Sequence, residues 1–199
     1  MAKATVAQNI VKPSAEGLAA SARAASKGGL PPVHLWNPPF CGDLDIRIAR
    51  DGTWFYLGTP IGRKPLVRLF STILKREGER YFLVTPVEKV GITVEDAPFV
   101  AVDFDVEGTG RDQAITFHTN VGDSVCAGPQ TPIRVVRDEV SGEPSPYVMV
   151  RGGMEALIDR KSFYRLVDLG EAAPHDGAQW FGVWSSVQFF PIIPVAELH

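Results

Sequence analysis

The chain has few of the residues from which the commonest catalytic and metal-binding motifs are built. Its 199 residues include two cysteines, Cys41 and Cys126, four histidines and no C-x-x-C spacing. Two thiols cannot form a zinc site by themselves, and we interpret them as reduced, mostly buried thiols of a cytosolic protein. A redox-active disulfide between them is an alternative that only their number supports.

Long hydrophobic runs and an excess of one charge are also missing. The longest apolar stretch near the C-terminus, residues 189–196, is interrupted by Pro191 and Pro194, whereas a membrane helix needs roughly 18 apolar residues in succession. The net charge is −3, which argues against a broad surface for nucleic acid or anionic membranes. We therefore expect a cytoplasmic protein with no membrane partner and no broad nucleic-acid surface.

No catalytic group is accompanied by the partners that it needs. Cys41 has no histidine nearby in the sequence, so a nucleophile activated by a base is not indicated. The pairs Asp43/Asp45 and Asp103/Asp105 each project from one face of a predicted strand, a spacing that suits a divalent cation or acid–base chemistry. Salt bridges on a solvated face are the commoner outcome. We expect no enzymatic activity, no cofactor and no metal; a metal-dependent hydrolase that uses the Asp pairs is the alternative.

Glycine and proline are somewhat abundant, and the share of hydrophobic residues is ordinary for a globular protein. With 19 Gly, 16 Pro and 45% hydrophobic residues, the composition predicts many short strands joined by tight turns. Alternating or continuous apolar residues predict strands at residues 43–48, 53–57, 80–85, 89–94, 99–105, 114–119, 133–136, 147–150 and 183–190, and near Val125. We expect an α+β fold with antiparallel sheets.

Three segments are predicted to be helical. The clearest is 65–77, where apolar residues recur at helical spacing between Pro65, which suits a first turn, and Gly78, which suits an end. Residues 160–169 predict a shorter helix. The Ala- and Ser-rich residues 14–27 predict a third, ended by Gly28 and Gly29. Their composition has a faint likeness to a transit peptide, which we do not favour.

Two stretches of the chain, 46–103 and 115–167, carry similar anchors in one order. This repetition predicts an internal duplication, with a ligand site at the seam between the copies. The matched anchors are Ile46-x-Ile48 and Ile115-x-Phe117, Thr59-Pro60-Ile61 and Thr131-Pro132-Ile133, Tyr81-x-x-Val84 and Tyr147-x-x-Val150, Glu88 and Glu155, and Phe99 and Phe163.

The predicted organisation has three parts. Residues 1–39 form an N-terminal helix and a proline-rich linker, residues 40–107 a first α+β unit and residues 108–199 a second. Gly108 and Gly110 mark the expected boundary between the two units.

The strongest candidate for a binding site is the turn-to-helix segment 58–65. A helix N-terminus with Arg63 and Lys64 attracts a phosphate or carboxylate, although pairing of these bases with surface acids is the commoner situation. On the preceding hairpin, Arg47, Arg50 and Trp54 suit a nucleobase or phosphate; the plainer alternative places Trp54 in the core.

In the predicted site the arginines hold the anionic end of a ligand, Trp54 stacks on it and Glu88 accepts hydrogen bonds. Residues from both units contribute. The ligand-binding set is Arg47, Arg50, Trp54, Arg63, Lys64, Glu88, Lys89, His118 and Arg151.

Several strings of residues resemble a bacterial family known as domain of unknown function 1285, and the likeness extends from Pro31 onward. They are Cys41-Gly-Asp-Leu-Asp-Ile-Arg-Ile, Arg50-Asp-Gly-Thr-Trp, Thr59-Pro-Ile-Gly-Arg, Leu66-Val-Arg-Leu-Phe, Tyr81-Phe-Leu-Val-Thr-Pro-Val-Glu-Lys and Val94-Glu-Asp-Ala-Pro-Phe-Val. The resemblance implies a duplicated core, a second half similar to pleckstrin-homology-like folds, a site between the halves for a nucleotide-like ligand, and a signalling role. It implies no assigned activity.

The expected function is therefore a non-enzymatic module that binds a small anionic or nucleotide-like ligand at the interface of the two units in bacterial signal transduction. A signalling protein is a further expected partner. Besides the metal-dependent hydrolase, a protein-interaction scaffold is the other alternative.

Overall fold

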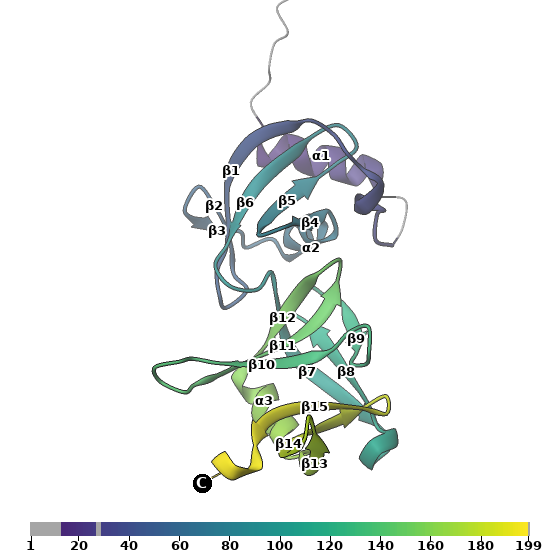
Figure 1. The fold of residues 1–199 in the computed structure, drawn as a ribbon. Coiled ribbons are helices and arrows are strands. Elements are labelled where there is room, and N and C mark those ends of the chain that lie inside the picture. The colour runs from purple at the N-terminus through teal and green to yellow at the C-terminus, as the bar shows by residue number, and fades with distance from the viewer. Residues whose placement is uncertain (1–12, 27–28, 199) are drawn as a thin grey trace, which may run out of the picture.

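The computed structural model describes residues 13–26 and 29–198 (Figure 1). Three α-helices and three short 3₁₀ turns lie in this part of the chain: α1 (Ala15–Ala25), α2 (Lys64–Thr72), α3 (Arg160–Val167), η1 (Val33–Leu35), η2 (Gly110–Asp112) and η3 (Val195–Glu197). The strands are β1 (Phe40–Ile48), β2 (Trp54–Tyr56), β3 (Thr59–Pro60), β4 (Leu74–Glu77), β5 (Arg80–Val84), β6 (Lys89–Val94), β7 (Phe99–Glu107), β8 (Ala114–Thr119), β9 (Ser124–Cys126), β10 (Ile133–Arg137), β11 (Pro144–Arg151), β12 (Met154–Ile158), β13 (Glu171–His175), β14 (Ala178–Ser185) and β15 (Gln188–Pro194).

Two six-stranded sheets share one topology. The first has the order β3-β2-β1-β6-β5-β4, and the second, written from its β9 edge, has the order β9-β8-β7-β12-β11-β10. In each sheet the central pair, β1 with β6 or β7 with β12, is parallel and the other neighbours are antiparallel. Two similar sheets are what a duplicated unit is expected to produce. The prediction of antiparallel pairing is wrong at the centre of each sheet, where the two strands are parallel.

The topology fixes which residues of the two sheets are equivalent. Arg76 lies opposite Tyr81 on β4 and β5, and Arg134 lies opposite Tyr147 on β10 and β11, so the anchor pair Tyr81 and Tyr147 is correct. The other four pairs fall on different elements or registers, because residue types such as Ile, Thr and Phe recur in many strands and do not fix the pairing. They are Ile46-x-Ile48 on β1 against Ile115-x-Phe117 on β8, Thr59 on β3 against Thr131 before β10, Glu88 before β6 against Glu155 within β12, and Phe99 on β7 against Phe163 on α3.

The first unit ends with β6 and the second begins with β7. The boundary expected at residue 108 follows β7, but this strand pairs with β8 and β12 and therefore belongs to the second sheet. The N-terminal helix is present as α1, whose cap Ser14 accepts a hydrogen bond from the backbone N–H of Gly17 at 3.1 Å. Residues 1–12 of the predicted N-terminal part lie outside the described residues.

The helix predicted at 65–77 ends at Thr72, and residues 74–77 form β4. The hydroxyls of Ser71 and Thr72 donate to the carbonyls of Arg68 and Leu69, both at 2.7 Å, a local bonding that favours helix ends. Gly78, at φ 60°, then turns the chain into β5. Pairing with β5 therefore overrides the helical periodicity of Ile73 and Leu74.

The C-terminal region adds a three-stranded antiparallel sheet, β13-β14-β15, which Figure 1 shows at the end of the molecule opposite the first sheet. The single strand predicted at 183–190 is a hairpin, because the chain turns back at Ser186 and Val187. Both turn residues have positive φ, 52° and 66°. The turn was missed because neither is Gly or Asn, the usual residues of such turns.

Within the described residues, we find no helix that combines the length and the apolar character required to cross a membrane.

Candidate functional site

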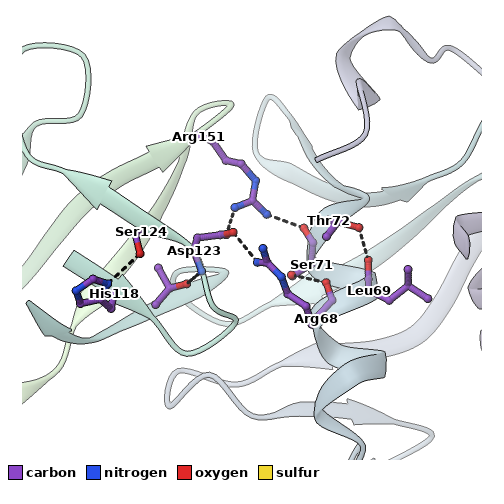
Figure 2. Close-up of polar contacts among 9 residues, drawn as sticks. Arg68, Leu69, Ser71, Thr72, His118, Asp123, Ser124 and Arg151 are labelled. Carbon is purple, nitrogen blue, oxygen red and sulfur yellow. Dashed lines mark hydrogen bonds and ion pairs between the residues drawn. The ribbon is translucent and has the colours of Figure 1, made fainter. Parts of the chain in front are cut away.

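A buried carboxylate joins the two units at their seam (Figure 2). Asp123, in the turn between β8 and β9, has 9% of its side chain exposed. Arg68 of α2 donates to its Oδ1 at 2.5 Å, and Arg151 of β11 donates to its Oδ2. Arg151 also donates to the Ser71 carbonyl at 2.7 Å and lies over the ring of Phe99. We name Arg68, Asp123 and Arg151 the Asp123 clamp; it fixes α2 against the second sheet.

Elsewhere on the seam, both units contribute to one pocket of about 250 Å³, which we name the seam pocket. Arg76 and Tyr81 come from the first unit, and Arg134 and Tyr147 from the second. These are the residues made equivalent by the topology. In each pair the guanidinium lies over the tyrosine ring, at 5.7 Å from the centroid for Arg76 and 4.5 Å for Arg134. The repeated sheet topology therefore brings the same pair twice to one pocket.

The two arginines of the seam pocket differ in how their charges are balanced. Arg134 donates to both oxygens of Glu155 at 2.6 Å, a bond that raises the pKa of Arg134. Arg76 donates to the carbonyls of Gly78 and Gly153 at 2.9 and 3.0 Å. Its nearest acid within the described chain is Glu79, at 3.4 Å and 94% exposed. Solvent screens that contact, so the charge of Arg76 is the less compensated.

A second polar group lies at the same pocket. The Tyr147 hydroxyl donates to Oδ1 of Asp96 at 2.8 Å, while Oδ2 lies 3.3 Å from Nε of Arg50. This distance makes an ion pair, but the groups are not aligned for a hydrogen bond, and Oδ2 is buried with no hydrogen-bond partner among the described residues. Burial raises the pKa of both Tyr81 and Tyr147. Both phenols are therefore neutral donors at neutral pH.

Two of the nine predicted ligand-binding residues lie at the seam. Arg50 donates to Ser145 Oγ at 2.9 Å, and Arg151 belongs to the Asp123 clamp. Both connect the units rather than lining the seam pocket. The prediction that Trp54 stacks on a ligand is wrong. Trp54 is 1% exposed and its ring stacks on that of Phe70 in the core, with 6.3 Å between the ring centroids.

The other six predicted residues are dispersed. Arg47 pairs with Glu95 and lies over Phe55. Lys89 pairs with Glu77 at 2.9 Å. His118 lies between Ser124 Oγ and Asp105 Oδ2, at 2.9 and 2.8 Å, on the more exposed face of β8.

Glu88 faces α1, where burial raises its pKa and a hydrogen bond from Ser21 opposes the rise. Arg63 and Lys64 begin α2, and Arg63 lines a cavity of about 350 Å³ with Arg23 of α1. Neither Arg63 nor Lys64 has an ion pair within the described part of the chain. The nine residues therefore do not share one site.

The sequence interpretation missed the four lining residues Arg76, Tyr81, Arg134 and Tyr147. Both tyrosines are among the repeat anchors, which is the signal that the sequence offers for them. Arg76 lies in β4, at the end of the segment 65–77 that the sequence predicts to be helical.

The prediction that Cys41 and Cys126 are mostly buried is wrong, because both are exposed.

The Asp pairs do not converge. Asp43 pairs with Arg80 at 2.7 Å in the first unit, whereas Asp103 pairs with Arg165 and Asp105 with His118 in the second. No group of three or more His, Cys, Asp or Glu side chains is placed to hold one metal ion in residues 13–26 and 29–198.

Two family models match the chain. The N-terminal domain of the domain of unknown function DUF1285 matches residues 31–97, and the C-terminal domain of the protein of unknown function DUF1285 matches residues 98–192. No curated protein matches.

Two crystal structures are similar. A DUF1285 family protein from Silicibacter pomeroyi DSS-3 is 67% identical with a TM-score of 0.83, covering 91% of this chain and 97% of that one. A DUF1285 family protein from Shewanella baltica OS155 is 28% identical with a TM-score of 0.49, covering 62% of this chain and 90% of that one. Because the two family models together span residues 31–192 and the first of these structures is 67% identical, the chain belongs to the DUF1285 family.

Proposed function

We propose that this protein is a non-enzymatic binding module that holds a small anionic ligand in the seam pocket. The observation that carries the proposal is the presence, in one pocket, of two arginine–tyrosine pairs made equivalent by the repeated fold. Pockets at the junction of two units are common sites for small molecules.

The chemistry of the lining favours an anion. Glu155 pairs with Arg134 and Asp96 pairs with Arg50, whereas the ion pair that Arg76 makes within the described residues is with the exposed Glu79. A carboxylate or phosphate oxygen at Arg76 would supply the missing negative charge. The neutral hydroxyl of Tyr81 adds a donor, whereas the hydroxyl of Tyr147 already donates to Asp96.

The size of the pocket restricts the ligand. At about 250 Å³, it is below the roughly 300–1,000 Å³ of drug-sized sites. A small monoanion is held whole, whereas a nucleotide-like ligand places only its phosphate or base between the two units and leaves the rest in solvent.

The wider form of the proposal comes from the family resemblance. It includes a role in bacterial signal transduction in the cytoplasm, a signalling protein as a partner, and a likeness of the second half to pleckstrin-homology-like folds. A ligand bound across the seam supports such a role, because it would stabilise one arrangement of the two units.

The test is a thermal-shift screen of monocarboxylates, inorganic phosphate and mononucleotides. At about 100 times its dissociation constant a ligand adds about 2.7 kcal/mol of stability, which raises the melting midpoint of a chain of this size by about 5–10 °C. We expect at least one anion to do so, and Arg76→Gln to abolish its effect.

The matched control is Arg80→Gln, which removes an exposed arginine of β5 that pairs with Asp43 away from the seam pocket. Tyr81→Phe is a second pocket variant that preserves shape. A screen without any stabilising anion, or a stabilisation that persists in both Arg76→Gln and Tyr81→Phe, contradicts the proposal.

A further inference from the structure

A second pocket, distinct from the seam pocket, lies beside α3. Its volume is about 390 Å³, and we name it the α3 pocket. Pro146, Leu157 and Phe163 give it an apolar side, while Glu143 and Arg160 stand among its polar lining residues. Pro146 and Phe163 are buried, whereas Glu143 and Arg160 are exposed. The pocket therefore combines an apolar wall with two opposite charges at the surface.

Arg160 has no carboxylate partner among the described residues. Its Nε donates to the Tyr164 hydroxyl at 3.0 Å, and its guanidinium lies over the Tyr164 ring, 5.5 Å from the centroid. The Tyr164 hydroxyl and, to a smaller extent, the Glu143 carboxylate raise the pKa of Arg160. The charges of Arg160 and Glu143 therefore interact electrostatically without forming an ion pair.

The backbone N–H of Glu143 donates to Ser141 Oγ at 3.2 Å, whereas its carboxylate has no ion pair or hydrogen bond within the described part of the chain. The remaining charged lining residues are already engaged. Arg50 contacts Asp96 and Ser145, and the Asp159 carboxylate caps α3 by accepting from the backbone N–H of Ser162 at 2.7 Å. One cation and one anion, Arg160 and Glu143, therefore remain for a ligand.

We propose that the α3 pocket binds a zwitterionic amino acid with an apolar side chain. Its carboxylate pairs with Arg160, its ammonium pairs with Glu143, and its side chain lies against Pro146, Leu157 and Phe163. A simple anion would bring no positive charge to balance Glu143, and an amine would bring no negative charge to balance Arg160. A ligand without charge would desolvate both groups without replacing their water. The zwitterion satisfies both charges and covers the apolar wall.

Calorimetric titration with L-phenylalanine tests this inference. The matched probes are phenylacetate, which lacks the ammonium group, and phenethylamine, which lacks the carboxylate. We expect L-phenylalanine to bind at least about tenfold more tightly than either analogue, because each analogue leaves Arg160 or Glu143 without a partner. A tenfold difference corresponds to about 1.4 kcal/mol. Arg160→Gln and Glu143→Gln should each weaken L-phenylalanine binding by a similar factor.

Lys161→Gln is the matched control, because it removes the same charge from the neighbouring position of α3, outside the pocket lining. It should leave L-phenylalanine binding unchanged, as should the seam variant Arg76→Gln. Circular dichroism of each variant checks that the fold is retained. Absence of L-phenylalanine binding, equal binding of phenylacetate, or an equal loss in Lys161→Gln overturns the inference. The seam-pocket screen is unaffected by any of these outcomes.

Discussion

Among individual residues, Val187 holds the least favourable backbone conformation for its type. It lies in the turn between β14 and β15 with φ 66° and is 68% exposed. A β-branched residue gains little from packing there, and the left-handed region costs an L-residue roughly 1–2 kcal/mol. We expect Val187→Gly to stabilise the protein by about 1 kcal/mol, after the entropic cost of glycine, and to raise the melting midpoint by about 2–4 °C.

Val140 offers the control for this substitution. It is 97% exposed in the turn between β10 and β11 and is not among the residues with positive φ. Val140→Gly removes the same side chain without relieving strain, so calorimetry should show no gain in its melting midpoint. An equal gain in both variants would show that the backbone at Val187 is not strained.

The residues of the seam pocket show how much of a site can be predicted from a single sequence. Tyr81 and Tyr147 are recognisable as equivalents because both precede a valine by three positions in apolar strands. Their partners Arg76 and Arg134 stand five and thirteen positions upstream, and only the strand pairing shows that they are equivalent. Cross-strand contacts depend on the pairing register, which the spacing along the chain does not contain.

Among the elements, β4 and β6 share a charged cluster whose effect depends on pH. Lys89 and Lys75 both contact the Glu77 carboxylate, at 2.9 and 3.0 Å, and their hydrogen bonds lower the pKa of Glu77 below its ordinary value of 4.5. A lowered folded-state pKa stabilises the protein above about pH 4.5, and this stabilisation is lost as the pH falls through the folded-state value.

We therefore expect Glu77→Gln to cost about 0.5–1 kcal/mol at pH 7, the upper range for partly exposed pairs, and to cost progressively less below about pH 4.5. Urea unfolding across pH 3–7 measures the difference. Glu107→Gln, which changes an exposed acid of β7 without an ion pair in the described chain, should leave the unfolding free energy nearly unchanged. A cost for Glu77→Gln that does not change with pH would show that the carboxylate charge is not the cause.

Element boundaries were predictable where the chain itself marks them. Strands 89–94 and 114–119 and the start of α3 at residue 160 were predicted at their observed positions, because the spacing of apolar residues along the chain is a local signal. The end of α2 was not, because Leu74 continues the apolar helical stripe and joins β4 through a pairing with Leu83. Tertiary contacts decided the assignment there.

For the molecule as a whole, the Asp123 clamp decides how firmly the two units are held together. One carboxylate with 9% exposure compensates two arginines, one from each unit, with exposures of 41% for Arg68 and 20% for Arg151. Asp123→Asn keeps the shape of the side chain and removes its charge, which leaves Arg151 facing Arg68 across the seam. Loss of one member of a buried pair costs about 3–5 kcal/mol, and we expect the lower end because Arg68 reaches solvent.

The loss of stability in Asp123→Asn should weaken the contacts between the two units before it weakens the contacts within each unit. Hydrogen exchange in Asp123→Asn is expected to rise first at the turn between β8 and β9 and at the C-terminal turn of α2. The central strands β1 and β7, whose residues Ile48 and Phe99 are fully buried, should retain their protection. Asp112→Asn, an exposed change in η2, is the control. If exchange in Asp123→Asn rises equally in all strands, the clamp supports the global fold instead of the seam. The arrangement of the two arginine–tyrosine pairs around one pocket would then have to be set by other contacts between the units.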